Sequence, residues 1–221
     1  MLKMAMNMDS CSNNSNKKSL VVVDLDGTLI NFKSIDNKII NELFGKNYVV
    51  RFLDRILWKI NELDYFSNCY AIFNIRIKIY AMFSKYTNSE IMGIYGDRYI
   101  ELALNETVSG YNHIKSLRGE NSEVIIVTHN VFADRLNKYV SCVPIIFSLN
   151  KKKYFTEELL KKYNIIYLIG NNYTDDIKAA YAVKAFPIYI GKSKLVKKLI
   201  KGRGKIVDNI KGAIDFIKTN R

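Results

Sequence analysis

The sequence contains few residues that constrain a chain covalently or hold a metal through sulfur and imidazole. Its 221 residues include two prolines, two histidines, three cysteines and one tryptophan. The cysteines, Cys11, Cys69 and Cys142, are odd in number, far apart and outside any C-x-x-C or histidine-paired spacing. This pattern argues against a structural zinc site and against a redox couple. It is typical of a reducing compartment, and we expect a cytoplasmic protein.

Long apolar runs are also missing. No stretch approaches the length of about 20 uncharged apolar residues that a bilayer-spanning helix needs, so we expect no transmembrane segment. The first 18 residues have neither the apolar run nor the small-residue cleavage site of a secretory signal, and we interpret residues 1–18 as a disordered tail. The chain as a whole is 48% hydrophobic, which suffices for one α/β domain with a modest insertion.

Acidic residues are outnumbered by basic ones. The 34 Lys and Arg residues and 21 Asp and Glu residues give a formal net charge of +13, which favours anionic partners of any kind. Part of the excess lies late in the chain, on a predicted helix whose other side carries Leu195, Val196, Leu199 and Ile200. We interpret it as a solvated helix face, with binding of nucleic acid or an anionic membrane surface as the alternative. The lysines concerned are Lys194, Lys197, Lys198 and Lys201.

Short apolar runs alternate with helical patterns over most of the chain. Runs typical of parallel strands buried on both faces occupy residues 20–24, 124–127, 143–147, 165–169 and 186–190. Helical spacing or capping residues predict helices at residues 132–140, 157–163, 176–183, 193–200 and 210–217. This alternation predicts an α/β fold built on a doubly wound parallel sheet.

One interval breaks the alternation. Residues 34–105 form long segments rich in Ile, Phe, Tyr and Leu, which we interpret as a mainly helical cap inserted into an α/β core of residues 19–33 and 106–221. Residues 73–79 alternate apolar and polar side chains as a strand does, but the apolar run continues without a turn signal, which favours a helix. Cap aromatics such as Trp58 and Phe73 are expected to be mainly core, although they would also allow a hydrophobic or lipid-like leaving group.

Polar side chains follow the predicted strands at their carboxyl ends, where open parallel sheets bind ligands. Asp24 and Asp26 follow the first strand, Thr128 ends the second, and Asn171 lies just after the fourth. A run of lysines, residues 151–153, follows the third strand. We therefore expect these side chains to converge at one edge of the sheet.

The residues at the first strand end suit phosphoryl transfer. Two carboxylates two positions apart in an extended turn point to the same side, so Asp24 can attack phosphorus while Asp26 protonates the leaving oxygen and later deprotonates water. Gly27 lets the backbone approach a phosphate, and Thr28 can stabilise the turn. A magnesium ion would offset the repulsion between carboxylates and phosphate, and a lysine and a threonine hydroxyl would bind the phosphoryl oxygens.

These segments resemble a known family. Residues 21–29, Val-Val-Val-Asp-Leu-Asp-Gly-Thr-Leu, resemble the first motif of the haloacid dehalogenase superfamily almost letter for letter, and residues 125–130, Ile-Ile-Val-Thr-His-Asn, resemble the second. The resemblance implies a Rossmann-like core, and a cap between these motifs resembles the type-one capped branch. It also implies an aspartyl-phosphate on Asp24, with Asp24 and the main-chain carbonyl of Asp26 as metal ligands. The residues that it implies near the phosphoryl group are Leu25, Gly27, Thr28, Thr128, His129 and Asn130.

The third and fourth motifs of the family match less closely. The third is a lone lysine, for which Lys153 fits best because a predicted helix follows at the usual interval, and Lys152 is the alternative. The fourth usually reads Gly-Asp followed by a second acidic residue, whereas this chain has Asn171 after the glycine. Asp175 and Asp176 both satisfy the spacing, and Asp176 is the better match. We expect this segment to complete the metal site, with Asn171 weakening it because an amide supplies no charge.

The sequence therefore predicts a magnesium-dependent phosphatase acting on a small phosphorylated metabolite. Asp26 favours phosphoryl chemistry over carbon–halogen cleavage, because the dehalogenases of the superfamily lack the second aspartate. A phosphotransferase or mutase would use the same residues. The basic C-terminal helix also allows a phosphatase of nucleic-acid ends or anionic lipid head groups, and Asn171 allows a non-catalytic binding protein.

Overall fold

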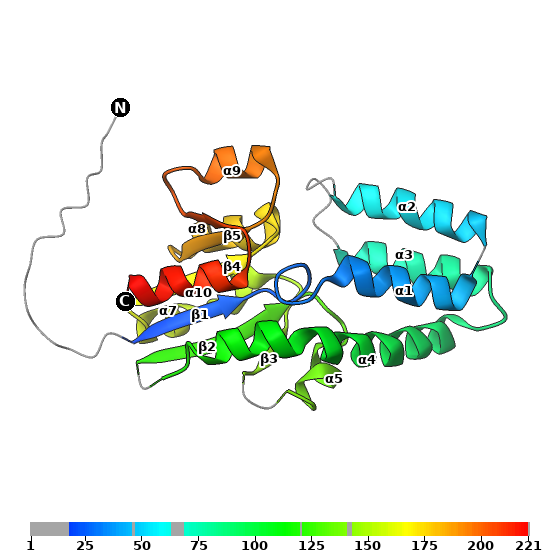
Figure 1. Ribbon diagram of the computed structural model, residues 1–221, viewed down its shortest axis with the longest axis horizontal. Helices are drawn as coiled ribbons and strands as arrows, with labels where there is room; N and C mark the ends of the chain where they lie inside the picture. Colours follow the sequence, from blue (N-terminus) through cyan, green and yellow to red (C-terminus); the bar gives the residue numbers. More distant parts are fainter. Residues whose placement is uncertain (1–17, 46, 63–68, 120, 141–142, 221) are drawn as a thin grey trace, which may run out of the picture.

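The protein is seen in a computed structural model that describes residues 18–45, 47–62, 69–119, 121–140 and 143–220 (Figure 1). Apart from Lys18, the predicted disordered tail lies outside these residues. Among the helices described, none combines the length and apolar character needed to cross a bilayer.

A six-stranded parallel sheet with the strand order β3-β2-β1-β4-β5-β6 forms the core. The first strand of the chain lies in the middle, so the two halves of the chain wind outward from it in opposite directions. In register, Val21 of β1 lies between Val124 of β2 and Tyr167 of β4. The predicted α/β class with a doubly wound sheet is confirmed. The strands are β1 (Ser19–Val23), β2 (Ser122–Thr128), β3 (Ile145–Phe147), β4 (Ile165–Gly170), β5 (Phe186–Ile190) and β6 (Lys205–Val207).

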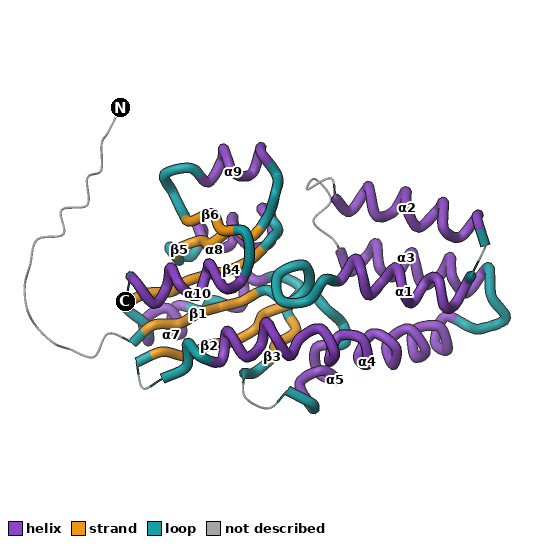
Figure 2. Tube along the Cα trace, in the orientation of Figure 1, coloured by secondary structure: helices purple, strands orange, loops and turns teal. Residues whose placement is uncertain are grey.

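Helices cover both faces of the central strand (Figure 2). Val21 and Val23 pack in one hydrophobic cluster with residues of α4 (Asn88–Lys115) and α10 (Ile210–Thr219). Leu20 and Val22 point to the opposite face and pack with residues of α7 (Glu157–Lys162) and α8 (Lys178–Ala182). Since both faces are buried, β1 is a continuous apolar run without the alternation of a half-exposed strand.

The interval between β1 and β2 is helical, and most of it lies beside the sheet on the right of Figure 1; we refer to this part as the cap. α3 includes residues 73–79, so the predicted helix at this alternating segment is confirmed. α4 begins at a capping box between Thr87 and Glu90 and continues for 28 residues into the core, so residue 105, the predicted end of the cap, lies inside a helix. The cap helices are α1 (Phe32–Phe44), α2 (Tyr48–Glu62), α3 (Cys69–Met82) and the first part of α4.

A buried polar network joins the four cap helices. Arg76 of α3 donates through Nε to Asp54 Oδ1 of α2 at 2.8 Å and through Nη2 to Asp36 of α1. The hydroxyl of Tyr95 on α4 donates to Asp36, and that of Tyr80 on α3 donates to Asp54. Asp36, Asp54 and Arg76 are at most 5% exposed. Since buried charges persist only when they are paired, this network holds the four helices in one arrangement.

Two elements differ from the predictions. The predicted helix at residues 176–183 begins earlier, as a π-helical turn η1 (Tyr173–Ile177) that runs into α8. The prediction of an apolar side on α9 (Lys194–Ile200) is only half correct, because Leu195 and Leu199 are 68% and 43% exposed. Val196 and Ile200 are buried in a cluster with Ile177 and Tyr189, which leaves the other two apolar residues of this short helix at the surface. Lys194, Lys198 and Lys201 are exposed, and Lys197 is partly buried.

Candidate active site

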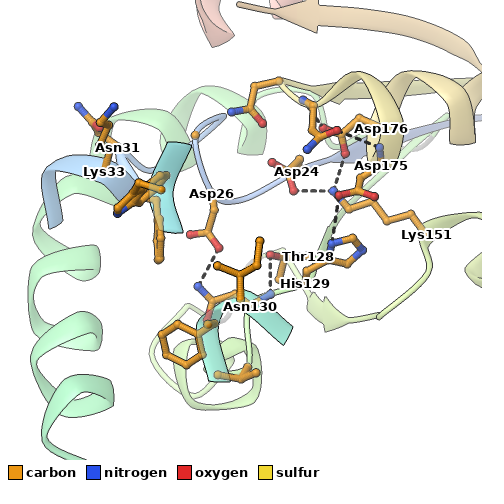
Figure 3. Close-up of a pocket in the computed structure, with 18 of the residues that line it drawn as sticks. Asp24, Asp26, Asn31, Lys33, Thr128, His129, Asn130, Lys151, Asp175 and Asp176 are labelled. Atoms are coloured by element: carbon orange, nitrogen blue, oxygen red, sulfur yellow. Dashed lines mark hydrogen bonds and ion pairs between the residues drawn. The ribbon is translucent and has the colours of Figure 1, made fainter. Parts of the chain in front are cut away.

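The carboxyl ends of β1, β2 and β4 meet at one edge of the sheet, facing the cap (Figure 3). A pocket of about 480 Å³ lies there between core and cap. The structure thus brings together the polar residues that the sequence places at separate strand ends. Those lining the pocket are Asp24, Asp26, Gly27, Thr128, His129, Asn130, Asn171, Asp175 and Asp176.

Asp24 lies at the centre of this group, directly after β1. Its backbone N–H donates to the Ile169 carbonyl of β4 at 2.8 Å, which fixes the point where the chain leaves the sheet. Its side chain accepts a hydrogen bond from Thr28 Oγ1 at 3.1 Å on Oδ2 and one from Lys151 Nζ at 2.5 Å on Oδ1. Burial raises the pKa of Asp24 to about 7, although the Lys151 charge opposes the rise. Lys151 is thus the main group that favours the ionised carboxylate.

The lysine that reaches the site is Lys151, and the prediction of Lys153, or alternatively Lys152, as the contacting lysine is wrong. Lys151 is 4% exposed, whereas Lys152 and Lys153 are exposed to solvent. The reason is local geometry. Asn150 caps a short helix, α6 (Lys151–Tyr154), so Lys151 shares the buried side with Phe155, four residues later, while the next two lysines point outward.

Asp176 is the second partner of Lys151. Its Oδ1 accepts from Lys151 Nζ at 2.5 Å and its Oδ2 accepts from the Asn172 N–H at 2.9 Å. The carboxylate is fully buried and lies against Gly170, where a Cβ atom would come within 2.1 Å of Oδ2. Burial disfavours the charge of Lys151, but Asp176 and Asp24 outweigh this effect and raise its pKa above the ordinary value. Asp176 therefore holds the lysine in place, and a metal ion would have to share one of its engaged oxygens.

Asp26 is held by two donors on opposite oxygens. The Tyr99 hydroxyl of α4 donates to Oδ1 at 2.7 Å, and Asn130 Nδ2 donates to Oδ2 at 2.8 Å. The Asn130 amide is itself oriented, because its oxygen accepts from the Phe132 N–H at 2.8 Å. Burial raises the pKa of Asp26, and the bonds from Tyr99 and Asn130 oppose the rise. Nothing in the local sequence around Tyr99 marks it as a site residue.

The turn after Asp24 brings the fourth motif close to the first. Gly27 has φ +81°, and a Cβ atom there would come within 2.1 Å of Asn171 Nδ2. Glycine is therefore required both by the backbone conformation and by the amide that lies over it. Leu25 is fully buried, and its carbonyl accepts from Thr28, Leu29 and Ile30. Only the backbone of Leu25, not its side chain, is thus available at the turn.

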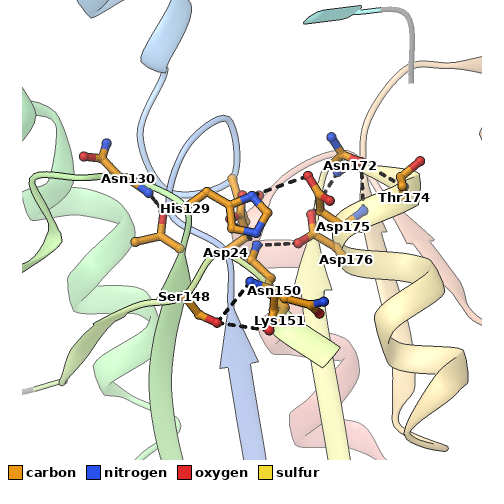
Figure 4. Close-up of polar contacts among 12 residues, drawn as sticks. Asp24, His129, Asn130, Ser148, Asn150, Lys151, Asn172, Thr174, Asp175 and Asp176 are labelled. Atoms are coloured by element: carbon orange, nitrogen blue, oxygen red, sulfur yellow. Dashed lines mark hydrogen bonds and ion pairs between the residues drawn. The ribbon is translucent and has the colours of Figure 1, made fainter. Parts of the chain in front are cut away.

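The side of the pocket formed by β2 carries Thr128 and His129, and Figure 4 shows His129 beside Asp175. Thr128 is 1% exposed, and its Oγ1 accepts from the Asn130 N–H at 3.1 Å. His129 Nδ1 lies 3.5 Å from Asp175 Oδ2, while its Nε2 is buried and has no partner among the described residues. Burial, aided by the Lys151 charge, lowers the pKa of His129 to about 4. The imidazole is thus neutral, and a ligand oxygen or a water molecule would satisfy Nε2.

The donor set fits a magnesium ion. The carboxylates of Asp24 and Asp176 are buried, that of Asp26 is partly buried, and all three lie near the ammonium group of Lys151. A divalent cation would offset the excess negative charge. Among the described residues, no group of three or more His, Cys, Asp or Glu side chains is arranged to hold a metal. Magnesium does not need such a cage, since it keeps several waters and takes one or two carboxylates. Asp24 and the amide oxygen of Asn171 suit that requirement.

Comparison with known proteins supports the fold assignment. No family model and no curated protein matches the sequence. Among solved structures, the chain is similar to the hydrolase YfnB of Bacillus subtilis bound to magnesium, with 13% identity and a TM-score of 0.57 over 91% of this chain and 99% of that chain. It is also similar to a haloacid dehalogenase-like hydrolase of Burkholderia xenovorans LB400, with 13% identity and a TM-score of 0.55 over 92% and 98%.

A third similar structure is a 2-haloacid dehalogenase of Pseudomonas syringae pv. tomato DC3000, with 12% identity and a TM-score of 0.52 over 92% of this chain and 100% of that chain. Each likeness thus covers the sheet and the cap together. The resemblance seen in the motifs is confirmed at the level of the fold, and the chain has the fold of the haloacid dehalogenase superfamily.

Proposed function

We propose that the protein is a magnesium-dependent phosphatase that hydrolyses small phosphate monoesters through an aspartyl-phosphate on Asp24. The observation that supports this most is the arrangement of Asp24 and Lys151. A buried carboxylate is held on one oxygen by a buried ammonium group at 2.5 Å, and a second carboxylate, that of Asp26, lies two residues away. This pairing provides a nucleophile, a cation for the phosphoryl oxygens and an acid-base group in one pocket.

In the first step, a carboxylate oxygen of Asp24 forms a bond to phosphorus while the bond from phosphorus to the ester oxygen breaks. Lys151 favours the ionised nucleophile against the effect of burial. Its ammonium group and the Thr128 hydroxyl line the same pocket, and we expect them to bind the phosphoryl oxygens.

Asp26 supplies the proton that the leaving oxygen takes up. Burial raises its pKa and so favours the protonated form. In the second step the resulting Asp26 carboxylate takes a proton from water, which attacks the phosphorus and releases Asp24 and inorganic phosphate. The bonds from Tyr99 and Asn130 fix the orientation of Asp26 through both steps.

A magnesium ion would be held by Asp24, the main-chain carbonyl of Asp26 and Asn171, with Asp175 and Asp176 beside them. When bound, it would neutralise charge on the phosphate and the carboxylates.

The second carboxylate favours phosphate esters over haloacids as substrates. A halide ion leaves without a proton, whereas an alkoxide leaving group needs one. Asp26 is held by two donors and can give this proton, which only the cleavage of an ester requires. A phosphotransferase would need the same residues, with a hydroxyl in place of water.

The test is magnesium-stimulated release of phosphate from p-nitrophenyl phosphate, compared between the wild type and Asp24→Asn. We expect Asp24→Asn to lose at least about a thousandfold in kcat/KM, as expected when a nucleophile is removed. Asp97→Asn is the matched control, since Asp97 is exposed and pairs with Arg135 away from the pocket. The proposal is wrong if Asp24→Asn hydrolyses the ester as fast as the wild type.

A second measurement separates an enzyme from a binding protein with the same fold. Beryllofluoride mimics a phosphoryl group on a carboxylate, so the proposed enzyme should bind it tightly and only with magnesium present.

Chloride release from 2-chloropropionate tests the dehalogenase alternative directly. Binding of nucleic acid or anionic vesicles by α9 stays a prediction. It is tested by neutralising the four lysines of α9 and its C-terminal end, Lys194, Lys197, Lys198 and Lys201.

A further inference from the structure

The pocket has two chemically different walls. The wall formed by the core carries the polar residues described above, whereas the facing wall is mainly apolar and aromatic. Its side chains come from three cap helices and from the segment after β2. They are Phe32 of α1, Trp58 of α2, Ile72 and Phe73 of α3, and Phe132.

The aromatic side chains form a continuous surface that begins beside the proposed acid. Phe32 lies 5.8 Å from Trp58 and 5.8 Å from Tyr99, measured between ring centroids, and Tyr99 donates to Asp26. Phe73 meets Phe132 edge to face at 6.0 Å. Because Asp26 protonates the leaving oxygen in the proposed reaction, the group bonded to that oxygen would lie against this surface.

Apolar area in this wall remains accessible. Phe32, Trp58 and Phe73 are only partly buried although they line the pocket. A ligand that covers about 100 Å² of such surface gains on the order of 50-fold in binding. The wall therefore provides binding energy to a ligand that is apolar and flat.

The polar groups on the cap side are few. Arg76 is 4% exposed and is bound to Asp36 and Asp54. The Asn31 side chain accepts from the Ser34 N–H and caps α1. Lys33 Nζ lies 5.6 Å from the centroid of the Trp58 ring. A leaving group rich in hydroxyls would need a partner for each buried hydroxyl, and this wall is poor in such partners.

We infer that the phosphate esters hydrolysed at this site carry an apolar, flat organic group, such as an aromatic ring, that binds between the cap aromatics and Asp26. The inference rests on the proposed function and specifies the substrate class. The pocket of about 480 Å³ is within the size range of sites for small ligands.

The experiment compares esters that differ in the organic group but not in the type of leaving oxygen. 3-Phenylpropyl phosphate, glycerol 3-phosphate and glucose 6-phosphate all release a primary alcohol, so the bond broken is alike. We expect a KM for the phenylpropyl ester at least about tenfold lower than for the other two. A lower KM for either hydroxylated ester overturns the inference while leaving the proposed phosphatase intact.

Variants of the apolar wall test whether its side chains cause this difference in KM. Phe73→Ala should raise the KM for 3-phenylpropyl phosphate about tenfold more than it raises the KM for glycerol 3-phosphate. Ile75→Ala is the matched control, because Ile75 lies on the same helix, is 47% exposed and does not line the pocket. Equal effects of Phe73→Ala on both esters would count against the inference. Phe73→Leu, which keeps an apolar side chain, replaces Phe73→Ala if the latter unfolds.

A binding measurement separates this inference from the proposed function. If the wild type hydrolyses no ester, the proposed function fails, but binding to the wall can still be tested by calorimetry with 3-phenylpropylphosphonate, which cannot be hydrolysed. We expect it to bind more tightly than methylphosphonate, and this difference to disappear in Phe73→Ala. Equal affinity for the two phosphonates overturns the inference by itself.

Discussion

Lys151 Nζ lies 2.5 Å from Asp24 Oδ1 and 2.5 Å from Asp176 Oδ1, so one buried ammonium group joins a carboxylate at the end of β1 to one in η1. Lys151→Ala would leave both carboxylates buried without a cation. We expect a loss of about 3–5 kcal/mol in the free energy of unfolding, measured by urea denaturation, and loss of phosphate release. Phosphate release must be measured where the variant is still folded.

The neighbouring lysines provide the control for this prediction. Lys152 and Lys153 are exposed, so Lys152→Ala and Lys153→Ala should each change stability by less than about 0.5 kcal/mol and keep full activity. An inactive Lys153→Ala beside an active Lys151→Ala would overturn the proposed role of Lys151 in phosphate binding.

Tyr99→Phe should remove one of the two donors to Asp26 while keeping the ring that packs against Phe32 and Phe132. Because Asp26 is proposed to protonate the leaving oxygen in the first step, which kcat/KM reports, we expect kcat/KM to fall about 10- to 100-fold for alkyl phosphates. The kcat/KM for p-nitrophenyl phosphate should change little, since that leaving group departs without a proton. A uniform fall in kcat/KM for all esters would indicate a purely structural role.

Tyr95→Phe is a close control for Tyr99→Phe. Tyr95 lies one turn earlier on α4, is equally buried and donates to Asp36, which does not line the pocket. This variant should lower the melting temperature without changing the dependence of kcat/KM on the leaving group.

Arg76→Met tests the buried network of the cap. It would leave Asp36 and Asp54 buried without their cation, and we expect a loss of about 3–5 kcal/mol in urea denaturation. Arg98→Met is the comparison, because Arg98 makes two hydrogen bonds to Glu42 at 2.7 and 2.8 Å at an exposed position. That surface pair should contribute far less to stability than the buried network. Similar losses in the two variants would argue against a special role of the network.

Asn171→Asp should strengthen magnesium binding. The new carboxylate has almost the same shape as the amide that lies over Gly27, and it adds a negative charge to the proposed ligand set. We expect the magnesium concentration for half-maximal phosphate release to fall roughly tenfold. An unchanged magnesium requirement would show that residue 171 does not contact the ion.

His129→Asn should reduce the pH dependence of stability in the presence of EDTA. Burial, aided by Lys151, lowers the pKa of His129 to about 4 in the folded chain, against about 6.5 in the unfolded chain. Between these values only the unfolded chain binds the proton, so stability falls as pH falls, by up to about 3 kcal/mol. His113→Asn should keep the wild-type slope, because His113 is exposed. A wild-type slope in His129→Asn would contradict the low pKa.

Much of the fold follows from local patterns in the sequence. The central strands are short apolar runs because helices cover both of their faces, and the prediction of a helix at residues 73–79 holds because the apolar run lacks a turn signal. The π-helical turn before α8 has no such pattern. It depends on Asn172, whose side chain accepts from the Thr174 and Asp175 N–H groups.

Site residues could be predicted only where a reactive side chain directly follows a recognisable strand. Asp24 and Asp26 stand out because a strand leads directly into them. Lys151 could not be distinguished from its neighbours by residue type, and the only usable signal was Phe155, four positions later on the same side of the chain. Tyr99 comes from a helix 73 positions away from Asp26 in sequence, so its role depends on how the cap packs on the core.

Helix α4 carries Tyr95, which belongs to the cap network, and Tyr99, which holds Asp26, on successive turns. A displacement of the cap by an ill-fitting ester would therefore also move the hydroxyl that orients the proposed acid. We expect such esters to be discriminated twice, once in affinity and once in the rate of bond cleavage. Both the binding of an ester and the cleavage of its bond would then depend on how well the ester fits the cap.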